Sequence, residues 1–389
     1  MPTPATNEYC TGCTACASAC PKGCITMAAD ENGFLCPVID LNRCVECGLC
    51  QKTCPLVNPL HLPEDMPKAY AAYSKDETVR MQSSSGGIFT EVAKAILNNG
   101  GVVFGAAYNE HFEVVHICAE TEAELAKLRG AKYAQSDLRG IFAEVKAILD
   151  NGQQVLFSGT PCQVGGLKAY LHKDYVNLVT VDFVCHSVPS PMAWREYVKY
   201  RAQQDNSGNL PQSIDLRAKT TGWSRYQYSN LFRYADGTEH AAKSGQSLYM
   251  KLFVGDYINR ESCANCQFKG YHRASDLTIG DFWGIWDVDP EMDDNKGTSV
   301  VLVQSDRGAE LLQKLADRLV IRSVSLEEAS RQNQAMLKVS APATQRQDAL
   351  ALIKEGRIAE CEKWFVEKKP SLGVRAKSKL KCLIRKIIN

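Results

Sequence analysis

The sequence of 389 residues contains no uninterrupted apolar run near the length of about 20 residues that a membrane-spanning helix requires. Its first residues form neither a basic nor an apolar segment, so no signal peptide is predicted. Net charge is almost absent too, because 45 Lys and Arg residues balance 44 Asp and Glu residues. A strong electrostatic attraction to nucleic acid is therefore not expected. We expect a cytoplasmic protein that binds no nucleic acid.

A GxGxxG motif after a predicted strand is also missing, so the sequence gives no support for a standard dinucleotide-binding domain. The hydrophobic share of 45% and the charged share of 23% are ordinary for a folded protein, which excludes disorder as the main feature. The length is enough for two or three domains, each with its own core.

Cysteine is abundant, with 17 residues, and ten of them lie within the first 54 positions. Residues 10–21 and 44–55 each follow the pattern CxxCxxCxxxCP, which is typical of bacterial two-cluster ferredoxins. In such proteins the fourth cysteine of each run binds the cluster of the other run. The spacing therefore predicts two 4Fe-4S clusters, one held by Cys10, Cys13, Cys16 and Cys54 and the other by Cys44, Cys47, Cys50 and Cys20.

Two structural zinc sites are the alternative, because eight cysteines would also suffice for them. Cys24 and Cys36 lie outside the pattern, and we expect them to be buried near the clusters as small apolar side chains. The insert between the two runs contains Asn32-Gly33, which predicts a hairpin turn.

The remainder of the chain alternates between predicted strands and helices. A proline-containing linker at 57–67 precedes this region. Strands are expected at 69–73, 102–106, 155–159 and 178–184, and helices at 88–98, 122–128 and 138–149. This alternation indicates an α/β core. The stretch from 213 to 286 has more strand and aromatic character, and the chain after residue 308 is expected to be mostly helical.

Four later cysteines form a second candidate site. Cys162 and Cys185 each follow an apolar strand, and ligands bind at the carboxyl edge of open α/β sheets. Cys263 and Cys266 add a chelating pair, which completes the four thiolates that a third 4Fe-4S cluster needs. Zinc on the same four residues, or a catalytic thiol at Cys162, are the alternatives. Structural or surface roles are expected for Cys118, Cys361 and Cys382.

Several short motifs occur together in one order across the core. They are Ser84-Ser85-Gly86-Gly87, Lys132-Tyr133-Ala134-Gln135-Ser136, Gly159-Thr160-Pro161-Cys162-Gln163, Cys185-His186, Gly222-Trp223-Ser224, Cys263-x2-Cys266 and the segment 276–284. With these motifs, residues 1–305 resemble the beta subunit family of coenzyme F420-reducing hydrogenase and dehydrogenase, fused to a two-cluster ferredoxin domain. The family usually has glycine after Cys-His, where this chain has Ser187. That residue is also small, so we expect cluster binding to be unaffected.

The resemblance implies FAD, at least one cluster beside it, and a two-electron substrate. The residues expected to contact FAD are Ser84, Ser85, Gly86, Gly87, Lys132, Tyr133, Gln135, Ser136, Thr160 and Asp281. Free N–H groups at 84–87, at the start of a helix, suit a pyrophosphate, although the same residues also suit a plain helix cap. Lys132 is a candidate to neutralise reduced flavin or a phosphate, or else a solvated surface lysine.

His186, beside Cys185, is a candidate proton donor, and the alternative is a histidine that shapes the cluster loop. Lys132 is the second candidate catalytic residue. Trp223, Trp283 and Trp286 are expected either to cover the cofactor or to belong to an ordinary aromatic core.

The complete prediction is a multidomain protein of mixed α+β and α/β class. A dicluster ferredoxin-like domain occupies 1–60, an α/β FAD and iron–sulfur domain with a mixed sheet 68–305, and a helical region 306–389. The last 22 residues hold eight Lys or Arg residues and no acidic residue, so this tail is a candidate for peripheral membrane contact or for partner docking.

The expected function is an iron–sulfur flavoprotein oxidoreductase that passes electrons through the clusters to FAD. We expect a redox partner protein such as a ferredoxin. The expected substrate is a small molecule or a glycan precursor, because relatives in this family include proteins associated with surface-polysaccharide genes. The alternative is a non-catalytic electron-transfer subunit that serves a partner enzyme.

Overall fold

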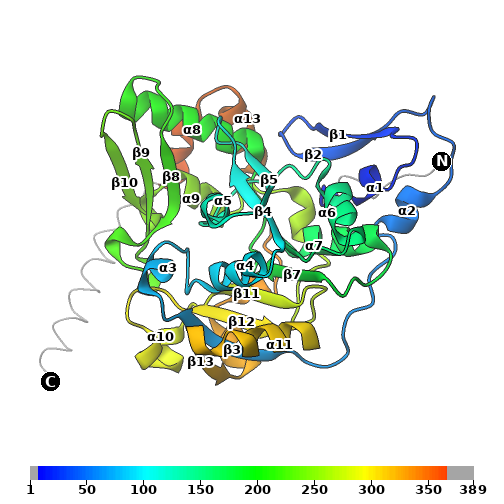
Figure 1. Cartoon of the computed structure of the whole chain (residues 1–389). Helices are drawn as coiled ribbons and strands as arrows, with labels where there is room; N and C mark the ends of the chain where they lie inside the picture. Colours follow the sequence, from blue (N-terminus) through cyan, green and yellow to red (C-terminus); the bar gives the residue numbers. More distant parts are fainter. Residues whose placement is uncertain (1–7, 366–389) are drawn as a thin grey trace, which may run out of the picture.

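An eight-stranded mixed sheet forms the centre of the protein (Figure 1). The computed structural model describes residues 8–365. The strand order is β13-β3-β12-β11-β7-β6-β4-β5. The strands are β3 (Lys68–Ser74), β4 (Val102–Tyr108), β5 (Val114–Ala119), β6 (Val155–Gly159), β7 (Leu178–Phe183), β11 (Leu277–Asp281), β12 (Ser299–Val303) and β13 (Leu319–Val324). Four neighbouring strands, β4, β6, β7 and β11, run parallel, and the outer strands pair antiparallel.

Helices cover both faces of this sheet because side chains alternate along each strand. In β6, Leu156 packs on one face, while Val155 and Phe157 pack on the other. The first face is covered by α4 (Ile88–Asn98), α5 (Glu122–Leu128) and α11 (Asp306–Lys314). The second is covered by α6 (Ile141–Asp150), α7 (Pro161–Leu171), α10 (Ile285–Val288) and α12 (Leu326–Arg331).

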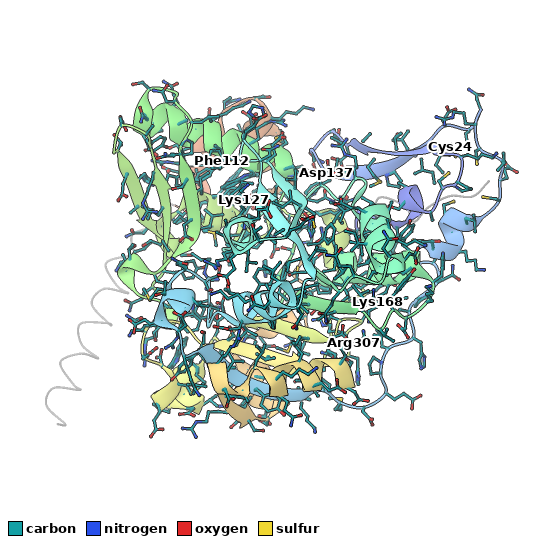
Figure 2. The ribbon with its side chains drawn as sticks, in the orientation of Figure 1. Cys24, Phe112, Lys127, Asp137, Lys168 and Arg307 are labelled. Carbon is teal, nitrogen blue, oxygen red and sulfur yellow. The ribbon has the colours of Figure 1, made fainter. Side chains whose placement is uncertain are left out.

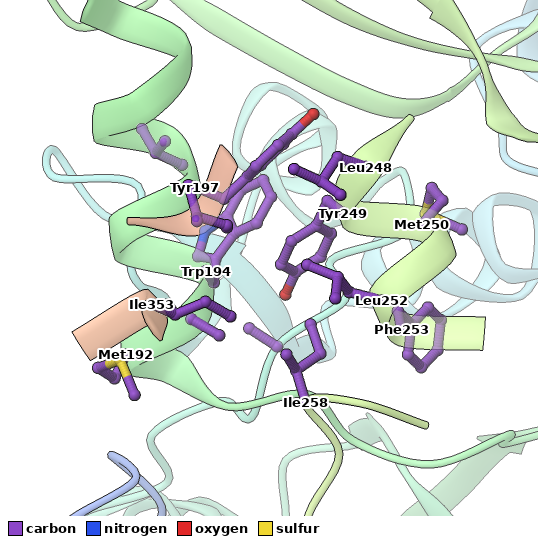
Figure 3. Packing of buried hydrophobic residues seen from close by; sticks show 14 of the residues in the cluster. Met192, Trp194, Tyr197, Leu248, Tyr249, Met250, Leu252, Phe253, Ile258 and Ile353 are labelled. Atoms are coloured by element: carbon purple, nitrogen blue, oxygen red, sulfur yellow. The ribbon is translucent and has the colours of Figure 1, made fainter. Parts of the chain in front are cut away.

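A second, smaller layer contains the antiparallel sheet β10-β9-β8. Its strands are β8 (Ser213–Ala218), β9 (Ser229–Arg233) and β10 (Glu239–Lys243), and they pack with α8 (Pro191–Asn206), α9 (Leu248–Val254) and α13 (Arg346–Lys354). The core between these elements is aromatic (Figure 3). Tyr249 stacks on Tyr197 and meets Trp194 edge to face, with ring centroids 5.0 Å apart in both pairs.

The N-terminal lobe consists of the hairpin β1 (Ile25–Ala29) and β2 (Leu35–Ile39) with two short helices, α1 (Ala15–Ser18) and α2 (Leu49–Thr53). The predicted hairpin turn is confirmed, and Gly33 there has a φ of 85°. Residues 54–67, all of which are described, contain no helix or strand, which agrees with the expected linker. Figure 1 shows this lobe beside the α6 and α7 side of the central sheet.

The structure contains several elements that were not expected from the sequence, among them α7, α8 and β12. The strand β5 pairs with β4 and was not expected from the sequence. The region after residue 308, expected to be mostly helical, contains β13, which pairs with β3 at the edge of the main sheet. Only Leu319 of β13 is buried, and the strand is held by its pairing with β3, which is distant in the sequence and which a local pattern does not show.

The remaining expectations concern the chain ends and single cysteines. Cys361 is fully buried in the aromatic core, while Cys118 is partly buried beside the α6 and α7 face. Between residues 8 and 365, no helix has the length and apolarity needed to cross a membrane. Cys382 and the basic tail 368–389 lie outside the described residues.

Candidate iron–sulfur and flavin sites

Two cavities in the N-terminal lobe are lined by cysteine. We call the first the proximal cavity, and its wall includes Cys10, Cys13, Cys16 and Cys54. Three of these thiols come from the first cysteine run and the fourth comes from the second. The chain can wrap this cavity tightly because Gly12 and Thr14 both adopt positive φ, 69° and 68°.

We call the second cavity the distal cavity. Its wall includes Cys44, Cys47, Cys50 and Cys20, again three thiols from one run and one from the other. Cys24 also lines it, with its Sγ 3.3 Å from Cys20 Sγ. Figure 2 labels Cys24 in this lobe. As expected, Cys24 and Cys36 are buried, but the position of Cys24 on the cavity wall was not foreseen.

The two cavities fit a cluster of several atoms. Zinc would draw its sulfur ligands to about 2.3 Å from one point. Among residues 8–365, no three His, Cys, Asp or Glu side chains are arranged to hold a single metal ion. The four thiols of each set line one cavity, which is compatible with the ligands of a cubane.

The four later cysteines come from three loops at one edge of the central sheet. Cys162 lies in the first turn of α7, directly after β6, and Cys185 follows β7, the parallel neighbour of β6. Cys263 and Cys266 lie in and after a short 3-10 turn, Glu261–Asn265. That turn is joined to the Cys185 loop by a hydrogen bond from Arg260 N to Val188 O, 2.9 Å. We call this group the core cysteines.

Local capping chemistry fixes the position of Cys162. Thr160 is the N-cap of α7, and Pro161 occupies its first turn. Gln163 Oε1 accepts a hydrogen bond from Thr160 N at 2.9 Å. The Thr160 hydroxyl lies 3.1 Å from Cys162 Sγ. Thr160 therefore contacts the sulfur of Cys162, one of the core cysteines, directly.

The core cysteines lie close enough to affect one another electrostatically. Burial, with a further contribution from neighbouring thiolates, raises the pKa of Cys162, Cys185 and Cys263 to about 12. Nearby positive charges oppose this rise in pKa: Arg260 at Cys162 and Cys263, and Lys269 at Cys185.

The proximal cavity lies against the core cysteines. Cys13 packs on Gly166 of α7, where an added Cβ would lie 2.8 Å from Cys13 Cβ and 2.9 Å from its Sγ. Burial raises the pKa of Cys13, and the charge of Cys162 raises it further. In contrast, the distal cavity has the solvent-exposed Cys47 on its wall. The order in space is therefore distal cavity, proximal cavity, core cysteines.

A buried arginine gathers three residues of the predicted flavin site. Arg217 donates to Tyr133 OH at 3.1 Å, to Asp281 Oδ2 at 2.6 Å and to Ser84 O at 3.4 Å. Arg217 Nε and Asp281 Oδ1 are both buried and have no hydrogen-bond partner. Two orphaned polar atoms at this position fit a polar ligand. Arg217 lies in β8, outside every quoted motif, and no sequence pattern pointed to it.

The loop 84–87 leads into α4, as predicted. Gly86 is required for packing, because a Cβ there would lie 2.5 Å from Ala72 O. Beneath the loop, the buried Lys219 Nζ donates to Ser85 O at 2.6 Å and to two further carbonyl oxygens. Arg217 and Lys219 together place two basic side chains behind this helix start, which suits an anionic group, and burial lowers the pKa of Lys219 to about 7. The packing role and the anion role of the loop are thus both compatible with the structure.

Other residues of the predicted flavin set make hydrogen bonds to parts of the protein away from Arg217. Gln135 Oε1 accepts from Leu35 N at 3.0 Å and therefore binds the N-terminal lobe. Ser136 Oγ lies 2.8 Å from His116 Nδ1, inside the sheet layer. Lys132 Nζ donates to Lys127 O and Arg129 O at the end of α5, and burial lowers its pKa to about 7. These side chains thus have protein partners away from Arg217.

His186 makes a contact that the sequence did not indicate. Its Nε2 lies 3.2 Å from Asp256 Oδ1, and its ring meets Phe253 edge to face. The two side chains are in proximity without a hydrogen bond, since His186 Nε2 is buried and has no hydrogen-bond partner. Both roles considered for His186 are compatible with this pair.

The tryptophans lie together near Ser84. Trp223 stacks on Trp283 with centroids 4.7 Å apart, and Trp223 Nε1 donates to Ser84 O at 3.1 Å. Tyr226 lies 4.4 Å from the Trp283 ring and 6.0 Å from that of Trp286. The aromatic cluster therefore borders the 84–87 loop. Trp223 itself is completely buried.

Cysteine-lined cavities in the lobe, beside a mixed α/β core, define an iron–sulfur protein. Residues 9–57 match the 4Fe-4S dicluster domain. Residues 69–142 and 152–329 match the N-terminal and C-terminal parts of the coenzyme F420 hydrogenase/dehydrogenase beta subunit. The chain belongs to this family of oxidoreductase subunits.

A solved structure is also similar to this chain. It is a chain of the F420-reducing [NiFe] hydrogenase complex from Methanosarcina barkeri, with 18% sequence identity and a TM-score of 0.46. The match covers 80% of this chain and 96% of that one. No curated protein sequence matches significantly.

Proposed function

We propose that this chain is an iron–sulfur flavoprotein oxidoreductase with three 4Fe-4S clusters and one FAD. When bound, the clusters carry single electrons, and FAD exchanges them for the two electrons of an organic substrate. The observation that supports this proposal most strongly is the contact of Cys13 with α7, the helix that carries Cys162. Through this contact of Cys13 with Gly166, the cysteines of the lobe lie next to the helix that carries a core cysteine.

In this proposal the cysteines are ligands in three sets. The proximal set is Cys10, Cys13, Cys16 and Cys54; the distal set is Cys20, Cys44, Cys47 and Cys50; the core set is Cys162, Cys185, Cys263 and Cys266. The exposed Cys47 places the distal set where a redox partner protein, such as a ferredoxin, can approach. Three of the four proximal cysteines are buried and the core cysteines are half-buried, so solvent reaches these sets less than it reaches Cys47.

The flavin residues are proposed on the basis of the Arg217 cluster. Ser84, Tyr133 and Asp281 converge on Arg217, and Lys219 lies behind the 84–87 loop. We propose that these residues orient FAD and offset its negative charge. His186, which lies 3.2 Å from Asp256 Oδ1 and follows Cys185, is proposed as the proton donor near the core set. Gln135, Ser136 and Thr160 support the surrounding loops.

The substrate is proposed only as a class. A two-electron organic compound, either a small molecule or a glycan precursor of surface polysaccharide, fits the redox chemistry. A non-catalytic role, in which this chain passes electrons to a partner enzyme, is the competing proposal.

Anaerobic purification with iron, sulfide and flavin quantified per chain separates these proposals. The proposed function requires about twelve iron atoms, since each of three clusters holds four, together with one FAD. About eight iron atoms without flavin would support the non-catalytic carrier. Protein without iron would refute both.

A further inference from the structure

Arg260 connects the N-terminal lobe to the loop of the core cysteines. Its guanidinium, 4% exposed as a residue, donates Nε to Cys10 O at 2.8 Å. Nη1 donates to Leu35 O and to Gln135 Oε1, both at 3.1 Å, and Nη2 donates to Cys36 Sγ at 3.2 Å. One side chain thus binds a ligand residue of the proximal set, the lobe hairpin and the core.

The backbone of Arg260 lies in the loop of the core cysteines. Arg260 O accepts a hydrogen bond from Cys263 N at 3.1 Å, and Arg260 N donates to Val188 O at 2.9 Å. The backbone of Arg260 therefore hydrogen-bonds within the loop that carries Cys263, while its side chain hydrogen-bonds the loop that carries Cys10. It lies between the two predicted clusters.

The charge of Arg260 is not balanced by its hydrogen-bond partners. All four acceptors are uncharged groups: two backbone carbonyls, one amide oxygen and one thiol. A buried cation among neutral acceptors is costly unless a negative charge lies nearby. Clusters bound by four thiolates carry net negative charge, and their potentials depend on nearby charges and hydrogen bonds.

We propose that Arg260 is a positioning residue whose buried charge raises the reduction potentials of the proximal and core centres together. This rests on the proposed function, in which both sets hold clusters. A reduced cluster is one unit more negative than an oxidised one, so a neighbouring cation favours the reduced form. The distal set lies on the far side of the lobe and is outside this effect.

The test is an anaerobic redox titration of the holoprotein and its Arg260→Met variant, followed by electron paramagnetic resonance. A Cys20→Ser background, which lacks one distal ligand, identifies the proximal signal. At the wild-type midpoint, the ratio of oxidised to reduced proximal centre is expected to rise at least tenfold, equivalent to about 59 mV for one electron. The core centre shifts in the same direction, and the distal centre does not move.

Three further variants separate charge from packing. Arg260→Lys keeps the charge and is expected to retain most of the wild-type potential. Gln135→Ala removes an acceptor of Arg260 without moving charge and is expected to shift the ratio less than twofold. Arg43→Met is the matched distal control, because Arg43 precedes Cys44 and is exposed, with its guanidinium bound to Lys22 O.

Equal shifts in Arg260→Met and Gln135→Ala would overturn the proposal, since packing would then explain the effect. An unchanged proximal potential in Arg260→Met would overturn it as well. If Arg260→Met does not retain its clusters, the other two variants decide. A wild-type-like proximal potential in Arg260→Lys, together with an unshifted potential in Gln135→Ala, supports the proposal. A shifted proximal potential in Arg260→Lys contradicts the proposal. A chain with only the two lobe clusters would refute the three-cluster function, while the proximal shift would still be measurable.

Discussion

The N-terminal lobe and the core cysteines place thiols around candidate iron sites in opposite ways. In the lobe, each CxxCxxC turn delivers three cysteines within seven residues, and only the fourth comes from the other run. In the core, Cys162, Cys185 and the pair Cys263 and Cys266 come from three separate loops. The lobe sites thus depend on local sequence, whereas the core set depends on the order of strands in a sheet.

The difference matters for stability. A local turn keeps its cysteines close together even when distant packing weakens. The core set is assembled only when β6 and β7 lie side by side and the 185–190 loop pairs with the 258–260 segment. We therefore expect damage to the sheet to empty the core set before it empties the lobe.

The largest effect is expected from Phe157→Ala in β6. Phe157 is completely buried, and removing such a side chain costs about 3–5 kcal/mol of unfolding free energy. The core iron is expected to fall while the iron of the lobe remains, as iron analysis and chemical denaturation would show. Phe232→Ala is the matched control, because Phe232 is equally buried in the smaller sheet. Equal loss of core iron in both variants would contradict the role of β6.

The second largest change in stability is expected from a variant in the proposed flavin site. Arg217→Met leaves Asp281 without its partner at 2.6 Å, and breaking a buried pair costs about 3 kcal/mol. Bound flavin per chain is expected to fall, with cluster iron unchanged, as absorbance and iron analysis would measure. In the double variant with Asp281→Asn, stability recovers but flavin does not. Full flavin content in Arg217→Met would rule out Arg217 as a flavin contact.

A smaller effect is expected where the two regions touch. Gly166→Ala forces a methyl group against Cys13, and overpacking of this kind costs about 1–3 kcal/mol. Reduction of the core centre through the lobe is expected to slow in stopped-flow measurements, with all clusters still bound. Gly245→Ala is the control, since a Cβ at Gly245 meets no atom within 4 Å. Wild-type kinetics in Gly166→Ala would show that electrons take another route.

The smallest effect concerns the residue that differs from the family pattern. The Ser187 hydroxyl is buried without a hydrogen-bond partner, so Ser187→Gly removes a group that stabilises nothing. Unfolding free energy is expected to change by less than about 0.5 kcal/mol, with unchanged iron content. A clear loss of iron on Ser187→Gly would mean that the serine shapes the cluster loop.

Much of this arrangement was predictable from patterns in the sequence. The two cysteine runs, the hairpin turn at Gly33 and the parallel strands before Cys162 and Cys185 all follow from spacing and local propensity. By contrast, β13 was missed because its pairing with β3 lies far away in the chain. The contact of His186 with Asp256 was missed for the same reason.

The sequence by itself determined which cysteines belong to the lobe, because three ligands of a cubane come from one short turn with a recognisable spacing. It also indicated the α/β core, because strand and helix periodicities are local properties of the chain. Only the tertiary structure decided that the proximal cavity, and not the distal one, faces the core cysteines. Only the structure placed the buried charges of Arg217, Lys219 and Arg260. A single basic residue in a sequence carries no sign of its burial, since burial depends on segments that folding brings together.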